Sequence, residues 1–445
     1  MKELGLRGLS HNIATTFGRQ VLATILNLLI VVLIARVYGP EGNGAFALAL
    51  LMPTMLASFL NLGVAPANVY FLGSNQLTVR NLLSANAPIF LWLGAIGSAV
   101  GACLLLWNAS GIFPGISPLI LWFALAIFPI RMLNSYLHSL FQGLQQFKPY
   151  NLLATLQPTF LLSLVSGLAL FGNRELVFLV GAEFLSQLFV LGLTLRWLLP
   201  FLGPKVKAKT TENIAKKILG YGWKAHLSNI LAFVNYKADV FLVNFFMGPA
   251  AAGVYVIAVG MSEKLWLMSQ AASTVLFPRL SQLSADENKR KILTPLVARW
   301  VLLSTLVATL IMAALAPWFI IWIFGLDYSG ALLPFWVLLP GIVCGAASRV
   351  LANDIAARGL PEWNLYTSLF VVIVNLIGNI LLIPNYGLAG AAASTTIAYS
   401  FNFILKIFIY EKISENPWID SIFIKPSDFK KISIIFRHKI ITNNK

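Results

Sequence analysis

Long apolar runs, separated by charged residues or turn residues, dominate the pattern of this chain. Residues 81–130 and 363–405 contain no charged side chain, and a Pro/Gly/Asn cluster breaks each run, NASGIFPGISP at 108–118 and PNYG at 384–387. A helix needs about 20 apolar residues to cross a bilayer. The pattern therefore predicts twelve transmembrane helices, at residues 12–37, 44–72, 82–107, 117–141, 150–172, 176–200, 220–247, 251–279, 296–325, 331–357, 364–384 and 388–410.

Composition supports a membrane environment. Of the 445 residues, 58% are hydrophobic and 11% are charged, and the mean hydropathy is +0.80. A water-soluble protein could not hide that much apolar surface. Cys103 and Cys344 lie in apolar runs without metal-binding or redox spacing, so no metal or redox site is expected. We expect an all-α polytopic membrane protein.

The distribution of Lys and Arg predicts the orientation. The chain carries a net charge of +16. Nearly all basic loop residues fall on the side of the two termini, whereas the other side holds only Arg36 and Arg174. Basic residues gather in cytoplasmic loops, and no nucleic-acid-binding motif surrounds them. Both termini are therefore predicted to lie in the cytoplasm.

Two sequence pairs indicate an internal repeat. YGPEGNGAFALA (38–49) matches MGPAAAGVYVIA (247–258), and GLQQFKPYN (143–151) matches GLPEWNLYT (359–367) at a similar offset. We expect two parallel six-helix lobes, related by a pseudo-twofold axis along the membrane normal. The expected boundaries are a lobe at 1–200, a basic cytoplasmic linker at 201–219, a lobe at 220–411 and a basic tail at 412–445.

Some ionisable residues lie within the predicted spans, where a charge costs at least about 2.5 kcal/mol without a partner or a wet cavity. We predict a cationic cavity for an anionic substrate, with the charge-balancing or ion-coupling acids beside it. The predicted substrate-binding cations are Lys237, Lys264, Arg131 and Arg349. The predicted coupling or charge-balancing acids are Asp239, Glu263, Glu183 and Asp354.

A structural role for these charges is the alternative, because buried acid–base pairs can tie helices together. Lys237 and Asp239 are two residues apart, so they point to nearly opposite faces of a helix and cannot form one local salt bridge. For Glu183 and Asp354 the structural role is favoured, since both are expected near helix ends.

An enzymatic function is disfavoured. The predicted outer loops are short, and the largest cytoplasmic loop, at 201–219, is Lys-rich and contains no His. We find no Ser/His/Asp set, no metal-ligand spacing and no phosphate-binding loop for ATP. No cofactor is expected, although H⁺ or Na⁺ coupling fits the acids within the spans.

Three stretches resemble bacterial polysaccharide transporters, the O-antigen and capsule flippases: ARVYGPEGNGAFALAL (35–50), KADVFLVNFFMGPAAAGVYVIA (237–258) and YGLAGAAASTTIAY (386–399). That resemblance implies the multidrug/oligosaccharidyl-lipid/polysaccharide flippase superfamily, with two lobes around a central cavity. It also implies translocation of an undecaprenyl-diphosphate-linked oligosaccharide to the outer leaflet by alternating access.

The expected partners are the lipid-linked oligosaccharide, a polysaccharide polymerase and its export machinery, and anionic membrane lipids. The last follow from residues 426–440, where apolar residues share a helical face and basic residues occupy the remainder. Two alternatives stay open. A cation-coupled multidrug antiporter would need a net acidic site, whereas the ionisable residues within the predicted spans, with Lys224 counted, are five cations against four acids. A lipid II-type flippase would need the same anion-binding chemistry.

Overall fold

A computed structural model describes residues 6–428 except for 74–75, 203–210, 283–285 and 427. Every regular element in this part of the chain is helical, as expected for an all-α membrane protein. Among the described residues, eight helices are long and apolar enough to cross a membrane. The α-helices are α1 (Leu6–Leu60), α2 (Val64–Gly73), α3 (Val79–Ile112), α4 (Pro118–Gly143), α5 (Phe147–Leu170), α6 (Leu176–Leu198), α7 (Thr211–Met247), α8 (Pro249–Lys264), α9 (Leu267–Gln282), α10 (Glu287–Phe324), α11 (Leu332–Ala357) and α12 (Pro361–Ser414).

The described helices cover all twelve predicted spans, but they divide them differently. The predicted span at 44–72 is not one continuous helix, because α1 ends at Leu60 and α2 begins at Val64. Helix α1 joins the predicted span at 12–37 to the first part of that at 44–72 at Gly39 (φ 68°), and α12 joins its two predicted spans at Gly387 (φ 57°). Only glycine adopts this left-handed backbone at little cost, so both glycines allow a sharp turn between spans. The exact number of membrane crossings stays a prediction.

The predicted span at 251–279 is not one continuous helix. Helix α8 ends at Lys264 and α9 begins at Leu267. Between them, the backbone N–H groups of Leu265 and Trp266 donate to the carbonyls three residues earlier, each at 3.1 Å. These tighter bonds break the regular α-helical ladder.

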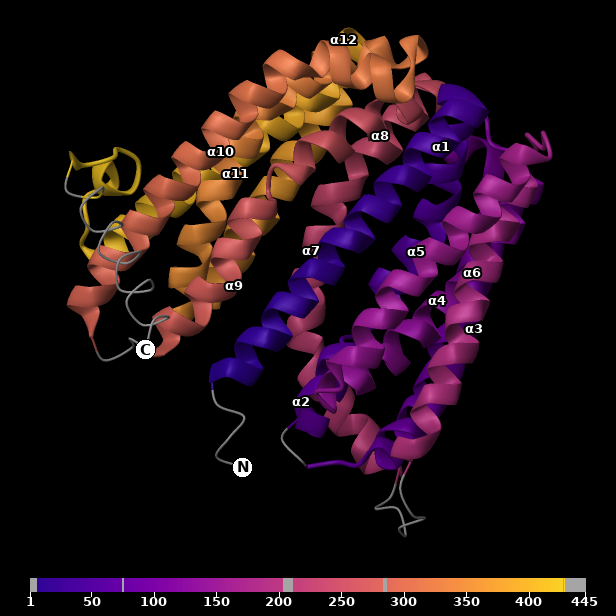
Figure 1. Ribbon diagram of the computed structural model, residues 1–445, viewed down its shortest axis with the longest axis horizontal. Coiled ribbons are helices and arrows are strands. Elements are labelled where there is room, and N and C mark those ends of the chain that lie inside the picture. The colour runs from indigo at the N-terminus through magenta and orange to yellow at the C-terminus, as the bar shows by residue number, and fades with distance from the viewer. Residues whose placement is uncertain (1–5, 74–75, 203–210, 283–285, 427, 429–445) are drawn as a thin grey trace. The chain divides into compact units, whose positions relative to one another are not determined.

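The first compact unit comprises residues 1–256 and 323–327. Within it, α1 packs against α4 and α5, and α4 also packs against α3 and α6 (Figure 1). Glycines on α3 allow close contact with α4, because a Cβ at Gly97 or Gly101 would overlap Phe128 or Leu125. Helix α7 packs against α1, α2 and α3.

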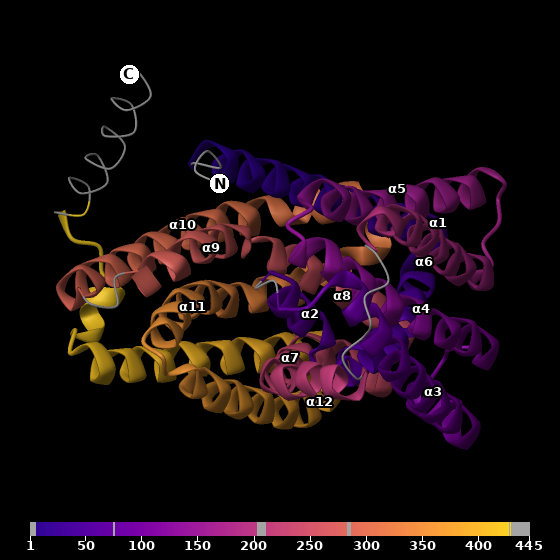
Figure 2. The same ribbon diagram turned by 90° about the horizontal axis from the view of Figure 1, so that it is seen from below.

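The second compact unit comprises residues 257–322 and 328–445, of which the ranges given above are described. Its α11 packs against both α9 and α12 (Figure 2). Gly341 of α11 lies so close to Thr396 of α12 that a Cβ would meet the threonine backbone, and Thr396 Oγ1 donates to the Val337 carbonyl at 2.6 Å. Small residues and internal hydrogen bonds thus replace bulky apolar packing here.

The two copies of the first repeat contact each other within the first unit. A Cβ on Gly44 would overlap the carbonyl oxygen of Pro249, and a Cβ on Gly253 would overlap the carbonyl oxygen of Pro40. Asn43 Nδ2 also donates to the Gly253 carbonyl at 3.2 Å. A Cβ on the glycine of each copy would thus overlap the proline carbonyl of the other copy. A pseudo-twofold axis between these two turns requires such a reciprocal contact. The symmetry of the whole lobes stays a prediction.

Candidate functional site

Arg131, one of the predicted substrate-binding cations, forms an ion pair inside the first unit. Its Nη2 lies 3.1 Å from Oε1 of Glu183 on α6, and its Nη1 donates to Thr54 Oγ1 on α1. The Glu183 side chain is 3% exposed and that of Arg131 is 28% exposed. Pairing lowers the cost of keeping both charges within spanning helices.

Glu183 is the centre of a larger polar network. Besides Arg131, its oxygens accept from Gln157 at 3.2 Å, from Ser186 at 3.3 Å and from Gln187 at 2.9 Å. Asn134 of α4 extends the network by donating to Gln187 Oε1 at 3.1 Å. Four packed helices therefore share one hydrogen-bonded carboxylate, and Glu183 lies well inside α6 rather than near its end as the sequence predicted.

Asp239 on α7 is also buried and hydrogen-bonded. Its Oδ2 accepts from the Tyr255 hydroxyl of α8 at 3.0 Å, and its Oδ1 accepts from the Val240 N–H at 2.7 Å. No ion pair joins Asp239 to Lys237, in agreement with the helical spacing that places them on different faces.

Lys237 lies at an apolar cavity of about 280 Å³ between α1, α3 and α7. Its side chain is exposed, and among the described residues it has no hydrogen bond or ion pair. The other lining residues are all apolar and no polar surface faces the cavity, so Lys237 contributes the aliphatic part of its side chain to the wall.

Arg349 of α11 stacks on an aromatic ring in the second unit. Its guanidinium carbon lies 5.1 Å from the centroid of Trp266, which is within cation–π range. The indole N–H of Trp266 donates to the Ile342 carbonyl at 2.9 Å, which fixes the ring. No carboxylate in the described part of the chain pairs with Arg349.

Lys406 of α12 was missed as a site residue, because the sequence pattern counted it with the cytoplasmic tail. It is 7% exposed, and within the described ranges its ammonium has no ion pair. Its positive charge and that of Arg349 repel each other, which means that the two cations lie near each other. The apolar residues IFIY at 407–410 were the available signal, since they show that the span continues past Lys406.

The remaining predicted residues of α8 lie at the helix break. Lys264 is the last residue of α8 and is exposed, and Glu263 is half-buried beside it. Three of the predicted acids, Glu183, Asp239 and Asp354, are buried. The predicted cations Lys237 and Lys264 are exposed.

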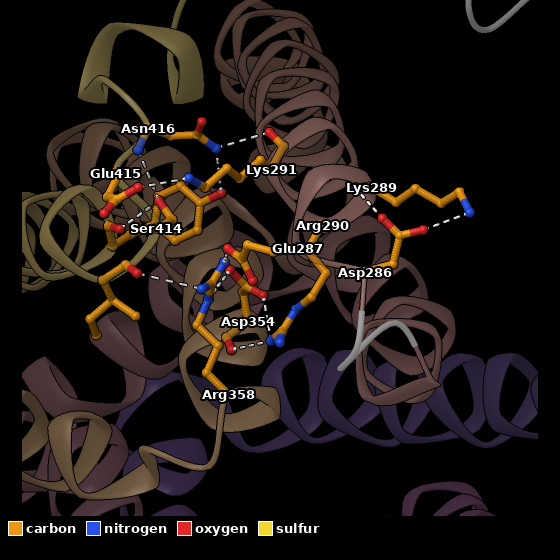
Figure 3. Close-up of polar contacts among 12 residues, drawn as sticks. Asp286, Glu287, Lys289, Arg290, Lys291, Asp354, Arg358, Ser414, Glu415 and Asn416 are labelled. Atoms are coloured by element: carbon orange, nitrogen blue, oxygen red, sulfur yellow. Dashed lines mark hydrogen bonds and ion pairs between the residues drawn. The ribbon is translucent and has the colours of Figure 1, made fainter.

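Asp354, near the end of α11, belongs to an ion cluster with α10 (Figure 3). Its Oδ1 lies 3.1 Å from Nη2 of Arg290, and its Oδ2 lies 3.0 Å from Nε of Arg358. Arg358 also reaches Glu287 at 2.7 Å. Asp354 is fully buried and holds helix ends together, as its predicted position near a helix end favoured.

The electrostatics of this cluster keep it charged. Burial lowers the pKa of Arg358, but the carboxylates of Asp354 and Glu287 more than offset this, so its pKa lies above the ordinary value. Figure 3 also shows Lys291 beside Glu415, with Nζ 3.0 Å from Oε2, which joins α10 to the segment after α12. Both arrangements are structural in character.

The described residues include no group of three or more His, Cys, Asp or Glu side chains that could hold a metal ion. The site chemistry therefore rests on cations without acidic partners, on hydrogen-bonded acids and on one apolar cavity.

Comparison with known families gives two extended matches. A family model described as "Polysaccharide biosynthesis protein" matches residues 9–284, and one described as "Lipid II flippase MurJ" matches residues 176–427. Each match covers more than half of the chain.

Individual relatives are distant. The chain is 23% identical over 221 residues to the "Probable low-salt glycan biosynthesis flippase Agl15" of Haloferax volcanii, which covers 48% of this chain and 45% of that protein. It is also 23% identical to the "Capsular polysaccharide biosynthesis protein CapF" of Staphylococcus aureus, over 89% of this chain and 98% of that protein. The chain thus spans about half the length of the first of these relatives.

A solved structure shares the fold. The "Lipid II flippase MurJ, inward closed conformation" superposes with a TM-score of 0.74 at 14% identity, covering 92% of this chain and 89% of that chain.

Proposed function

Because the chain belongs to the polysaccharide biosynthesis protein family of the multidrug/oligosaccharidyl-lipid/polysaccharide flippase superfamily, we propose that it moves a lipid-linked oligosaccharide across a membrane. The substrate we propose is an undecaprenyl-diphosphate-linked glycan, carried from the cytoplasmic to the outer leaflet for O-antigen, capsule or exopolysaccharide export. The membrane is the bacterial cytoplasmic (inner) membrane, with both termini in the cytoplasm. Transport proceeds by alternating access of two lobes, without a covalent step.

One observation carries this proposal: in the described spans, three acids are satisfied while several cations are not. Glu183, Asp239 and Asp354 are buried and accept hydrogen bonds or ion pairs. Lys237, Arg349 and Lys406 form no direct ion pair with a carboxylate among the described residues, and Lys237 interacts with Asp239 only at longer range. A cation within a membrane span needs either a partner or a polar ligand, and a diphosphate supplies negative charge that can serve as one.

The roles we propose follow from these environments. Lys237, Arg349 and Lys406 attract the diphosphate, and exposed Lys264 assists at the helix break. Arg131 is already matched by Glu183, so we assign it to positioning: it keeps the polar network of α1, α4, α5 and α6 in place.

Ion coupling is assigned to Asp239. It is buried, its two oxygens each accept one neutral donor, and among the described residues no cation forms a direct ion pair with it, although the charge of Lys237 acts on it at longer range. A proton or Na⁺ could therefore neutralise it. We expect Asp239→Asn to remove the dependence of transport on the ion gradient while leaving gradient-independent equilibration intact. Transport that is driven equally well in the variant would contradict this role.

A multidrug antiporter of the same superfamily is the competing function. It would bind organic cations, which the unpaired cations of these spans repel. A lipid II-type flippase uses the same lipid diphosphate chemistry and differs in the glycan, which charge alone does not distinguish. A polysaccharide polymerase and its export machinery are the proposed partners downstream.

The test is lipid translocation in reconstituted vesicles. A fluorescent undecaprenyl-diphosphate oligosaccharide is placed in one leaflet, and its appearance in the other is followed with an impermeant quencher. Labelled phosphatidylglycerol in parallel vesicles controls for unspecific scrambling. Selective movement of the diphosphate lipid supports the proposal, whereas exchange of organic cations for protons without lipid movement would replace it by antiport.

A further inference from the structure

The cavity beside Lys237 has features that the proposed substrate's headgroup does not explain. It measures about 280 Å³, and twelve of its thirteen lining residues are apolar. A sugar or a diphosphate would leave its polar groups unpaired against such walls, which is unfavourable for each group. The occupant of this cavity must therefore be largely apolar.

Two aromatic pairs build the cavity walls. Phe59 of α1 meets Phe233 of α7 with ring centroids 5.7 Å apart and an interplanar angle of 80°. Phe113, which follows α3, meets Phe241 of α7 at 5.8 Å and 87°. Edge-to-face pairs of this kind hold the rings in defined orientations. The walls thus present aromatic faces and edges to the space between α1, α3 and α7.

Lys237 gives the cavity its charge preference. It is the one charged lining residue, and among the described side chains it has no ion pair or hydrogen bond. Only the aliphatic part of its side chain lines the cavity, because no polar surface faces the space, and the ammonium lies outside the lining. A molecule that places a hydrocarbon chain in the cavity and an anionic group at the ammonium would match both parts of this side chain. Organic cations and neutral hydrocarbons lack the anionic group that would complement Lys237.

The size of the cavity limits how much hydrocarbon it can hold. An apolar protein cavity of about 150 Å³ binds one benzene. The 280 Å³ here is roughly twice that volume, so it fits about ten carbons, or two isoprene units. Burying one such segment would favour binding, because each buried CH₂ group is removed from water.

We propose that this cavity binds the phosphate-proximal isoprene units of a polyprenyl diphosphate, with Lys237 contacting the phosphate. The inference rests on the proposed function for the identity of the lipid and extends it by assigning a separate site to the carrier chain. The protein binds the isoprenoid chain of the lipid next to its charged end. It therefore selects a branched, unsaturated anionic lipid rather than the glycan alone. The remainder of the long carrier chain stays in the bilayer.

Binding is tested on the full-length protein with a short isoprenyl diphosphate that carries a photoreactive group on its first or second isoprene unit. After irradiation, labelled peptides are identified by mass spectrometry. We expect labelling within residues 51–59, 104–113 or 233–241. Labelling elsewhere, or equal competition by unlabelled phosphatidylglycerol, would overturn the assignment.

Cavity filling provides the second arm. Ala238→Trp places a large ring in the cavity and is expected to reduce labelling at least tenfold. The matched control is Ala99→Trp on an exposed position of α3 outside the cavity, which should label like the wild type. If Ala238→Trp does not fold, Met55→Ala enlarges the cavity and should shift the preferred probe to one isoprene unit longer. Unchanged labelling or preference in the folded variant contradicts the proposal.

The headgroup contact provides the third arm. Lys237→Gln should weaken binding of the diphosphate probe about tenfold and leave that of the corresponding uncharged isoprenol unchanged. Lys237→Arg should restore diphosphate binding, and Lys217→Gln, at an exposed α7 lysine outside the cavity, should have no effect. An equal loss for both probes would contradict the phosphate contact.

The binding and transport results separate the two proposals. Cavity labelling by a protein that moves no lipid-linked oligosaccharide would overturn the flippase function and leave the isoprenyl site standing. Normal translocation by Ala238→Trp, with labelling outside the cavity, would overturn the isoprenyl site and leave the flippase function intact.

Discussion

Arg131 in the first unit and Lys406 in the second are both cations within long apolar helices, but their surroundings differ. Arg131 pairs with Glu183 and donates to Thr54, and Glu183 accepts three further hydrogen bonds. Lys406 is 7% exposed and has no ion pair in the described part of the chain. The first arrangement stabilises the packing of four helices. The second leaves a charge that only a ligand from outside can satisfy, which is why we assign substrate binding to it.

The largest effect is expected where the first arrangement is broken. Glu183→Ala removes the acid from Arg131, Gln157 and Gln187 at once, and leaves a cation unpaired in the interior. Removing one partner of a buried ion pair costs about 3–5 kcal/mol, so we expect a marked fall in the thermal midpoint of the purified protein. The double variant Arg131→Met/Glu183→Leu should recover much of that loss. Similar midpoints for wild type and Glu183→Ala would show that the network is not structural.

Arg349 is expected to affect transport rather than folding. Arg349→Gln removes the charge beside Trp266, so translocation of the diphosphate lipid should fall about tenfold, which corresponds to about 1.4 kcal/mol. Arg349→Lys keeps the charge and should retain most of the rate. A loss of thermal stability that matches the loss of transport would indicate that Arg349, like Arg131, stabilises the fold rather than binding substrate.

Lys406 should give a stability change of opposite sign to that of Glu183. Lys406→Met keeps the aliphatic stem and removes a buried charge next to that of Arg349. We expect the folded state to be stabilised by about 1 kcal/mol, measured as a higher thermal midpoint, while translocation decreases. Destabilisation would mean that the ammonium makes a favourable interaction, and the contrast with Arg131 would then fail.

The smallest effect is expected at the protein surface. Lys291 and Glu415 form an ion pair, but the Glu415 side chain is 83% exposed. Exposed pairs contribute little because water screens them, so Glu415→Gln should change the free energy of unfolding by less than about 0.5 kcal/mol. The change should vanish in high salt. A large effect would indicate that the segment after α12 is held more tightly than this contact implies.

The sequence predicted the helices well, because apolar runs and Gly/Pro turns act locally. Gly39 and Gly387 lie between predicted spans and adopt the left-handed backbone that such turns require. The break at Leu265 and Trp266 was not predicted, since no Gly or Pro marks it. It coincides with the hydrogen bond from Trp266 to Ile342, a contact between residues far apart in the chain.

The site was predicted only in part, and the limits are physical. The local spacing of Lys237 and Asp239 excluded an ion pair, and the structure has none between them. The pairing of Arg131 with Glu183, 52 residues apart, depends on how α4 packs against α6, which no local pattern encodes. Lys406 was missed because it was counted with the basic residues of the tail, although the predicted span at 388–410 already contains it.

The most direct test compares translocation of the lipid-linked oligosaccharide by two variants in the same vesicles. One is Arg131→Met/Glu183→Leu, which removes a matched pair, and the other is Arg349→Gln/Lys406→Gln, which removes two unmatched cations. We predict that the first folds and transports at a rate near that of the wild type, whereas the second folds but transports at least tenfold more slowly. Equal rates for both variants would contradict the assignment of substrate binding to the unpaired cations.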